Sequence, residues 1–435
     1  MLSIGFILPP STNAKPFRQV PLTSLYLLTI LQEKFGNKID VSTIDLRGVK
    51  EDSVQYYIPE KDVYLYTVMS PEWEDVLYVH KSIKNMYPQA KHIAGGVHVY
   101  LFQEESLKVF DSISIGAGEI TIIEIVSDIL NGREPKQIYR YEALGTIDIN
   151  EYPIPLRSFL LKNAVAQTGL LVGKNSNLIA SDALFSRWCP FHCAFCVNIT
   201  FGKTKFRSPL LIEKEIEYLK KEYKIEALVL KDDNGIPIQR DIAKTFLEAI
   251  ARTNIKWRGQ SRANGISEDM VRLAAESGCT DIAIGIESAS PQVIKAIDKK
   301  IDLEEAKKYI QLLKKYNIGA RLLLIMGLPG EDENIYSQML SFVNETEPTS
   351  VVLSLFSPYP GSPMMKNPEK YGIKLLQHEY RQLRNYFGRL DRNEKPELFY
   401  KYDEVTPWGK SLSNETLLRY YADLQGIFRD RGLNF

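Results

Sequence analysis

The sequence predicts an α/β fold in two parts, each built around a parallel sheet, with a helical segment after them. Short apolar runs alternate with helical patterns over roughly the first 140 residues, and the alternation resumes from about Asn177. Between the two parts, Pro153 and Pro155 favour an extended connection. Strands that alternate with helices of about 10–15 residues are typical of parallel sheets.

The first part, assigned to residues 1–140, has five strand-like runs, at residues 2–8, 41–46, 63–68, 92–94 and 112–116. This pattern predicts a flavodoxin- or Rossmann-like doubly wound sheet, which binds ligands at the carboxyl ends of its strands. Two loops follow such ends, one with Gly95, Gly96 and His98, the other with Gly116, Gly118 and Glu119. Glycine lets a backbone approach a ligand closely, although strand-to-helix turns also use it for steric reasons.

The second part, assigned to residues 173–365, follows a linker at residues 141–172. Six strands are expected, at residues 178–184, 227–231, 255–259, 281–286, 319–325 and 350–356. Their spacing predicts a partial, TIM-type (β/α)6 barrel. Active sites of such barrels are built from the loops that follow the strands.

Three cysteines follow the first barrel strand as C-x3-C-x2-C: Cys189, Cys193 and Cys196. Thiolates at this spacing can bind three irons of a cubane cluster and leave the fourth iron open for chemistry. A zinc site would need a fourth ligand, and His192 has no partner at ligand spacing. Three buried core thiols, or a disulfide framework in so long a chain, fit the pattern less well.

With Phe195 in the aromatic position, this loop resembles the C-x3-C-x-aromatic-C loop of the radical S-adenosylmethionine (SAM) superfamily. In that family SAM chelates the open iron of a [4Fe–4S] cluster, and an electron from the cluster cleaves it to a 5′-deoxyadenosyl radical. The resemblance therefore implies an oxygen-sensitive enzyme. It also implies a reductant such as flavodoxin or ferredoxin.

The resemblance extends to later strand ends. Gly285, Glu287 and Ser288 match the family's G-I-E-S pattern, in which Glu287 would accept hydrogen bonds from the SAM ribose. Gly327 and Pro329 belong to a G-L-P-G-E match, where the glycines would pack against adenine.

Two further strand ends carry charges that suit SAM. Asp232 and Asp233 are candidates for its amino group, with a solvated loop or helix cap as the alternative. Arg262 is a candidate for its carboxylate, because a guanidinium binds a carboxylate through two hydrogen bonds. A surface ion pair is the alternative for Arg262.

The two glycine loops, with Pro9-Pro10 and Pro21-Leu22, resemble the cobalamin-binding N-terminal domain of one radical SAM branch. No D-x-H-x-x-G loop is present and no histidine precedes His80, so the resemblance implies a cobalt without a histidine ligand. This fold also occurs without its cofactor, so bound cobalamin and an empty domain both stay open.

Residues 366–435 carry charged and aromatic side chains, with helical patterns at residues 377–390 and 414–428. We expect a helical cap over the barrel mouth that determines the substrate, with ordinary surface helices as the alternative. The absence of a second cysteine pair argues against a cysteine-rich auxiliary-cluster domain.

Cys279, at the far end of the fourth barrel strand, is expected to pack in the core. Without a further cysteine pair to carry a methyl group, a methylating enzyme of this kind would have to use cobalamin. The resemblance therefore implies, as the first interpretation, a cobalamin-dependent methyltransferase acting on an unactivated carbon or phosphinate. The alternatives are a radical rearrangement, ring contraction, cyclisation or deoxygenation, and a non-enzymatic cofactor binder.

Charge and hydropathy limit the classes of partner that the chain can bind. Lys+Arg and Asp+Glu both number 54, which argues against non-specific nucleic-acid binding. No run of about 18 apolar residues predicts a membrane span, and the N-terminal residues lack the pattern of a secretory leader. We expect a soluble, cytoplasmic enzyme with a small-molecule or natural-product-like substrate.

Overall fold

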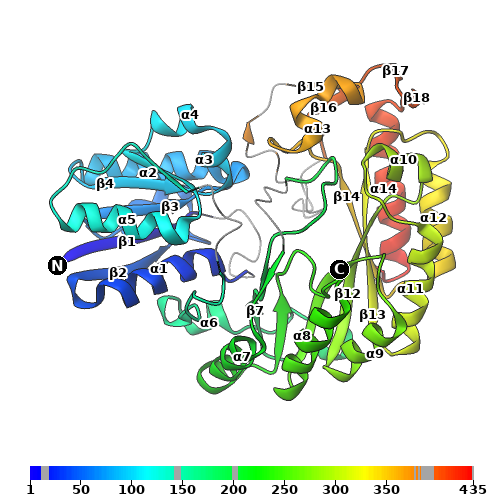
Figure 1. Ribbon diagram of the computed structural model, residues 1–435. Helices are drawn as coiled ribbons and strands as arrows, with labels where there is room; N and C mark the ends of the chain where they lie inside the picture. The colour runs from blue at the N-terminus through cyan, green and yellow to red at the C-terminus, as the bar shows by residue number, and fades with distance from the viewer. Residues whose placement is uncertain are drawn as a thin grey trace.

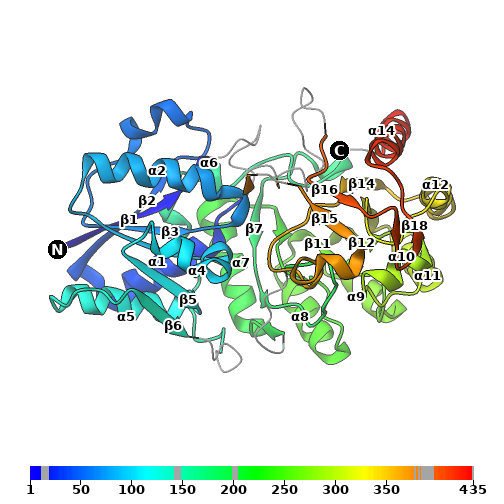
Figure 2. The same ribbon diagram turned by 90° about the horizontal axis from the view of Figure 1, so that it is seen from above.

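The computed structural model contains two six-stranded sheets, one in each part of the chain (Figure 1). It describes residues 1–10, 19–141, 148–197, 204–376, 379–380, 383 and 396–433. The two parts lie side by side, as the view from above also shows (Figure 2).

The N-terminal sheet has the order β2-β1-β3-β4-β5-β6, and all its strands are parallel. Its strands are β1 (Leu2–Leu8), β2 (Ile39–Asp45), β3 (Val63–Thr67), β4 (Lys91–Gly95), β5 (Ser112–Gly116) and β6 (Ile138–Tyr141). The first five confirm the flavodoxin-like order, and β6 adds an edge strand that the sequence did not reveal. Because β1 lies between β2 and β3, the strand order reverses there, which opens a crevice at the carboxyl ends.

Helices cover both faces of this sheet because its strands are apolar on both sides. One face packs against α1 (Leu22–Phe35) and α5 (Gly118–Leu130), and the other against α2 (Trp73–Met86). The short helices α3 (Val97–Leu101) and α4 (Gln103–Leu107) connect β4 to β5. The second glycine loop leads directly into α5, because β5 ends at Gly116 and α5 begins at Gly118.

The second sheet has the order β7-β10-β11-β12-β13-β14, again with parallel strands. Its strands are β7 (Ala180–Ala183), β10 (Ala227–Leu230), β11 (Lys256–Arg262), β12 (Cys279–Glu287), β13 (Gly319–Met326) and β14 (Ser350–Leu355). This arrangement confirms the partial (β/α)6 barrel.

Amphipathic helices pack around the outside of the barrel. They are α7 (Pro209–Tyr223), α8 (Arg240–Arg252), α9 (Glu268–Glu276), α10 (Pro291–Ala296), α11 (Leu303–Lys315) and α12 (Ile335–Thr346). In α7, Pro209 starts the helix, where its missing N–H costs nothing, and Ile212, Ile216 and Leu219 are buried on one face.

The C-terminal segment contributes both a helix and short strands. Helix α14 (Asn414–Asp430) packs along β14, where Gln425 donates a hydrogen bond to the carbonyl of Leu353. The strands are β15 (Ile373–Leu375), β16 (Tyr400–Tyr402), β17 (Val405–Thr406) and β18 (Gly409–Lys410). Helix α14 therefore extends the outer layer of the barrel (Figure 1), whereas the helix expected at residues 377–390 lies almost wholly outside the described residues.

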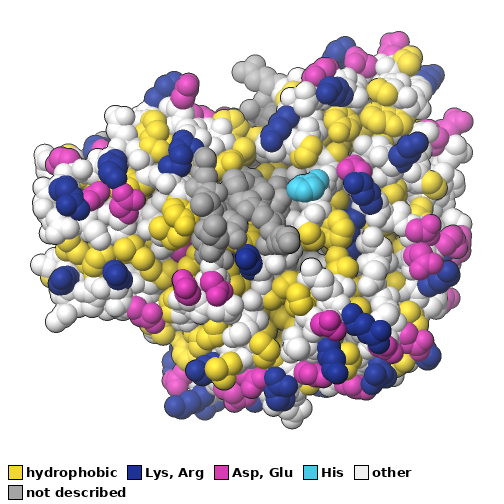
Figure 3. Space-filling view, in the orientation of Figure 1, with side chains coloured by type: hydrophobic (Ala, Val, Ile, Leu, Met, Phe, Trp, Pro, Cys, Tyr) yellow, Lys and Arg dark blue, Asp and Glu magenta, His cyan; other side chains and the backbone are white. Residues whose placement is uncertain are grey.

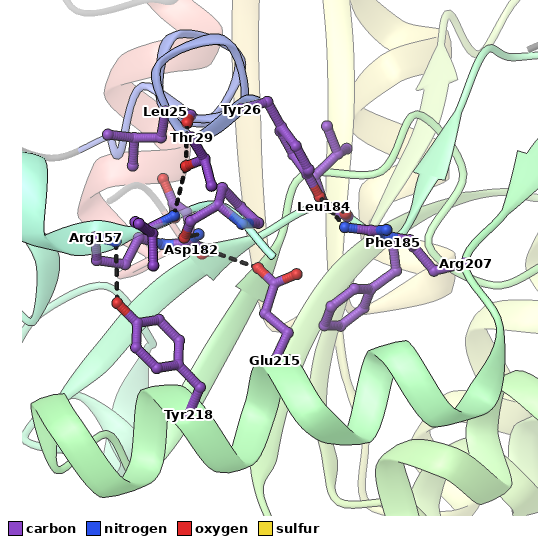
Figure 4. A network of polar contacts seen from close by, with 12 residues as sticks. Leu25, Tyr26, Thr29, Arg157, Asp182, Leu184, Phe185, Arg207, Glu215 and Tyr218 are labelled. Carbon is purple, nitrogen blue, oxygen red and sulfur yellow. Dashed lines mark hydrogen bonds and ion pairs between the residues drawn. The ribbon is translucent and has the colours of Figure 1, made fainter. Parts of the chain in front are cut away.

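Two buried arginines attach the connecting segment to the barrel. Arg207 donates to the carbonyls of Ile149, Tyr152 and Pro153. Arg157 donates to the carbonyl of Pro155 and forms an ion pair of 2.8 Å with Glu215 on α7 (Figure 4). The segment also includes a short helix, α6 (Lys162–Val165).

Side chains of α1 join the same network. Tyr26 accepts a hydrogen bond from Arg207, and the hydroxyl of Thr29 accepts one from the backbone N–H of Leu156. The N-terminal part, the connecting segment and the barrel are thus joined through buried polar contacts.

Acidic and basic side chains are interspersed on the face drawn in Figure 3, which shows no extended patch of a single sign there. Within the described residues, no helix combines the length and apolar character that a bilayer crossing requires.

Candidate active site

The cysteine loop lies at the carboxyl end of the barrel strands. It follows β8 (Ser186–Arg187), which pairs with β9 (Lys205–Phe206). The backbone N–H of Ala194 donates to the carbonyl of Ile297, and the carbonyl of Ala194 accepts from Met364. Cys193 is buried, and the half-buried Phe195 packs against the barrel core. The loop is therefore fixed by contacts with the rest of the barrel.

The chemistry of the three thiols fits a cluster. Cys196 is exposed at the surface, but partial desolvation within the loop, and then the neighbouring thiols and the carboxylates of Asp233 and Glu287, raises its pKa. Burial also raises the pKa of Cys189. Thiolates at these positions need a cationic partner, which iron provides.

No three His, Cys, Asp or Glu side chains gather around one metal position in the described part of the chain. A cubane cluster does not require its thiolates to converge on one ion, because each thiolate binds its own iron.

The residues just before Cys189 contact the second glycine loop of the N-terminal sheet. Trp188, which has a φ of 69° that is rare for a bulky side chain, packs against Ala117, as Tyr152 also does. Arg187 forms an ion pair of 2.8 Å with Glu119 at the start of α5. Glu119, a predicted cofactor residue, therefore lies beside the cysteine loop, and no local sequence signal indicates its partner, Arg187.

The paired aspartates at the end of β10 separate. Asp232 is wholly buried and accepts a hydrogen bond from the backbone N–H of Phe185, and burial raises its pKa to about 7. Asp233 is exposed, and its charge acts to raise the pKa values of Cys189 and Cys196. Of the two, Asp233 is the candidate for the SAM amino group, whereas Asp232 supports the backbone before the cysteine loop.

Arg262, at the end of β11, contacts the cysteine loop directly. Its Nη1 donates to the Sγ of Cys193 at 3.3 Å, and its guanidinium carbon lies 3.7 Å from the centroid of the Phe191 ring. The N–H group that donates to Cys193 is therefore not available for the predicted contact with SAM.

Glu287 forms a buried ion pair that the sequence did not reveal. Its Oε1 lies 2.7 Å from the Nζ of Lys299, and both side chains are almost entirely buried. A Cβ on Gly285 would lie 2.6 Å from the Glu287 carboxylate, which explains the glycine. Ser288 is buried and its hydroxyl accepts from the N–H of Ser290, which caps α10.

The loop after β13 is held by groups from within the protein. Glu331 accepts hydrogen bonds from the backbone N–H groups of Gly327 and Leu328. Tyr400 and Tyr402, on β16, both donate to the carbonyl of Gly327 at 2.9 Å.

Gly327 has a φ of 95°, and a Cβ at this position would collide with the hydroxyl of Tyr400, which explains the glycine. Pro329 is buried beside it. The alternation of two tyrosines on one strand was the sequence signal available for this contact. An adenine contact at this loop stays a prediction.

The glycines of the first loop also have internal reasons. Gly96 has a φ of 100°, and a Cβ there would lie 2.7 Å from the backbone of Val68. A Cβ on Gly95 would make only ordinary contacts with Ser114. His98 is buried, and its ring stacks on Trp73 at 4.2 Å between the ring centroids. His98 therefore lies inside the helical layer, away from the cysteine loop.

In the second loop, Gly116 has a φ of 93°, which favours glycine, whereas a Cβ on Gly118 would only touch Leu27. This loop, unlike the first, adjoins the cysteine loop through Ala117. Among the predicted cofactor residues, Gly116, Gly118 and Glu119 are thus the ones of the N-terminal sheet that the fold brings toward the cysteines.

Comparison with known proteins agrees with this architecture. Residues 184–343 match the family model of the radical SAM superfamily. An uncharacterized methyltransferase of Pyrococcus horikoshii is 26% identical over 392 residues, which cover 83% of this chain and 82% of that protein. The anaerobic magnesium-protoporphyrin IX monomethyl ester cyclase of Rubrivivax gelatinosus is 23% identical over 353 residues, 77% of this chain and 64% of the cyclase.

Among solved structures, the radical SAM methyltransferase TsrM from Kitasatospora setae, with cobalamin and a [4Fe–4S] cluster bound, has a TM-score of 0.70. The identity is 14%, and the match covers 94% of this chain and 88% of TsrM. The likeness extends over both parts of the chain and is one of fold.

Proposed function

The chain belongs to the radical SAM superfamily, and from this premise we propose that it is a cobalamin-dependent methyltransferase. Its substrate would be an unactivated carbon of a small, natural-product-like molecule. Cys189, Cys193 and Cys196 would hold the [4Fe–4S] cluster, and Asp233 and Glu287 would contact SAM. The enzyme would work in a reducing cytoplasm with flavodoxin or ferredoxin as its reductant.

One observation carries the proposal: the second glycine loop of the N-terminal sheet touches the residues before the first cluster cysteine. The Glu119–Arg187 ion pair and the packing of Trp188 on Ala117 form this contact. A ligand at the carboxyl end of the N-terminal sheet would therefore adjoin the cluster. Cobalamin, when bound there, supplies a cobalt that accepts and donates a methyl group.

The histidines of the N-terminal part support a cobalt without an imidazole ligand. His80, His92 and His98 pack against aromatic rings of the layer that contains α2. Burial lowers the pKa of His98 to about 4 and that of His92 to about 3. These rings are neutral packing groups inside the layer, not groups that face the crevice.

The remaining cysteine does not suit a covalent methyl carrier. Cys279 begins β12, at the end opposite the cysteine loop, and burial raises its pKa well above the ordinary value. A nucleophilic carrier must be an accessible thiolate, and Cys279 is a buried thiol. This argument favours cobalamin as the carrier.

A second candidate is a radical cyclisation, rearrangement or deoxygenation without methyl transfer. The similarity to the Rubrivivax gelatinosus cyclase supports it, because that relative covers much of both parts of the chain. The two candidates differ in their products. Methyl transfer of this type consumes SAM to S-adenosylhomocysteine as well as 5′-deoxyadenosine, whereas the alternative yields no S-adenosylhomocysteine.

The test uses SAM that carries a deuterated methyl group. The reconstituted protein, prepared anaerobically with cobalamin, is incubated with the labelled SAM, a reductant and a small-molecule extract. The proposal predicts S-adenosylhomocysteine together with a compound that has gained the labelled methyl group. Formation of 5′-deoxyadenosine and a changed but unlabelled compound would favour the second candidate instead.

A further inference from the structure

Arg262 contacts a cysteine that the proposed function assigns to the cluster. Arg262 is the last residue of β11 and is only 7% exposed. Its Nη1 donates a hydrogen bond to the Sγ of Cys193 at 3.3 Å. An N–H group directed at a cluster ligand acts on the electronic properties of the cluster, because hydrogen bonds to the sulfurs are among the factors that set its potential.

The surrounding contacts fix the guanidinium in one orientation. Its Nη2 donates to the backbone carbonyl of Lys299, and its Nε lies 3.3 Å from the Oδ1 of Asn264. The ring of Phe191, a member of the cysteine loop, covers one face at 3.7 Å. The planar fork of arginine fits such a set of partners, whereas the point charge of lysine would not make all of these contacts.

These contacts use part of the donor capacity of Arg262. Three of its five N–H groups have protein partners, and one face of the group is covered by Phe191. One N–H group on each terminal nitrogen is left, so the contact expected with the SAM carboxylate stays a prediction. The contact with Cys193 directs the same group at the cluster.

We propose that Arg262 is a positioning residue that raises the reduction potential of the [4Fe–4S] cluster through its hydrogen bond to Cys193. This inference rests on the cluster of the proposed function. Reduction adds one negative charge to the cluster, and a buried cation beside a ligand sulfur stabilises the added charge. The consequence for catalysis is that a physiological reductant can supply the electron that SAM cleavage requires.

The experiment is a redox titration of the anaerobically reconstituted protein, followed by electron paramagnetic resonance in the absence of SAM, cobalamin and substrate. Arg262→Gln should keep the iron and shift the equilibrium constant for one-electron reduction at least tenfold toward the oxidised cluster, which is about 59 mV. Arg262→Lys should shift it less, because it retains a positive charge without the stacked fork.

The matched control is Arg272→Gln on α9, whose guanidinium pairs with Glu276 at the surface. It should have the wild-type potential. If Arg262→Gln does not hold iron, the reduction potentials of Arg262→Lys and Phe191→Leu test the proposal instead. Phe191→Leu removes the ring that orients the guanidinium and keeps every cysteine. A lowered potential in these variants supports the proposal.

A wild-type potential in the iron-loaded Arg262 variants overturns the proposal. If such variants lose SAM affinity instead, Arg262 binds the SAM carboxylate, as the sequence suggested. A wild-type protein without a four-iron cluster would refute the proposed function together with this inference. A wild-type cluster whose potential does not depend on Arg262 would refute this inference alone.

Discussion

Glu287 reaches the cysteine loop as half of a buried ion pair with Lys299. Removing two charges from water is costly, and the 2.7 Å contact offsets part of that cost. The φ of 66° at Glu287 is unusual for a residue other than glycine, and strain of this kind gathers at functional sites. The G-I-E-S match identified Glu287, but no spacing rule identified Lys299, which contacts it from beyond α10.

Glu287→Gln should weaken SAM binding while the iron content stays at the wild-type level, because it removes the predicted contact with the nucleoside and the ion pair with Lys299 but no cluster ligand. Loss of a charge-assisted hydrogen bond typically costs about 1.5–3 kcal/mol, roughly one to two decades of affinity. Equilibrium binding of SAM to the reconstituted protein measures the effect. Glu304→Gln, at an exposed pair with Lys307, is the control, and equal affinity in both variants would assign Glu287 a structural role.

Replacement of Cys193 by alanine should abolish both iron binding and SAM cleavage, because a cubane needs all three thiolates of the loop. Cys279→Ala should retain about four irons per chain, since this buried thiol lies at the far end of β12. Iron analysis and the assay for 5′-deoxyadenosine check both variants. SAM cleavage by Cys193→Ala would rule out the cluster assignment.

The loop after β13 shows how one element depends on another that is distant in sequence. Tyr400 and Tyr402, on β16, fix the carbonyl of Gly327, and burial raises the pKa of each hydroxyl well above 10, so both remain donors. Glu331 binds the N–H groups of the same loop from its other side. The C-terminal segment thus reaches the barrel mouth through β16, while α14 covers the outside of β14.

Glu331 should make stability depend on pH. Burial raises its pKa from 4.5 to about 8, although the N–H groups of Gly327 and Leu328 act in the opposite direction. Between these values the folded protein holds a proton that the unfolded chain has released, so its contribution to stability is present at low pH and falls as the pH rises toward 8.

Denaturant unfolding of the anaerobic protein at pH 5, 6.5 and 8 measures this dependence. Glu331→Gln should have a flatter profile than the wild type, whereas Glu304→Gln, at the surface, should follow it. Identical slopes for the wild type and Glu331→Gln would mean that the carboxylate is ionised across the whole range.

The regular elements could be read from sequence because each has a local signal. The six barrel strands lie within a few residues of their expected positions, since apolar runs mark buried strands. The short strands β6 and β15 to β18 carry too few residues for a period to show. The position of α14 could not be read either, because its apolar stripe fits the barrel mouth and the outside of β14 equally well.

At the scale of the whole molecule, the relation of the two parts depends on buried polar groups. Arg207 is 4% exposed and binds three carbonyls of the connecting segment, and its guanidinium also faces the ring of Tyr26 on α1. The sequence indicated a proline-containing linker but not its partner. Hydrogen bonds between an arginine and backbone carbonyls leave no pattern in the side chains of the segment that they hold.

Arg207→Met should loosen the N-terminal part from the barrel, because it leaves buried carbonyls without donors at a cost of roughly 1–3 kcal/mol each. Calorimetry should show a lower first transition and a separation between the unfolding of the two parts. Arg240→Met, at an exposed pair with Asp269, should unfold like the wild type. One transition at the wild-type temperature in Arg207→Met would show that the apolar contacts suffice.

The proposed function requires that one chain hold both a cluster and a corrinoid at adjoining loops. Metal analysis of the protein, isolated anaerobically from cells supplied with cobalamin, measures both. We expect about four irons and one cobalt per chain, with the absorption spectrum of a corrinoid. Four irons without cobalt, in protein that still turns over its substrate, would show that the N-terminal part carries no cofactor, and the methyltransferase proposal would fail with it.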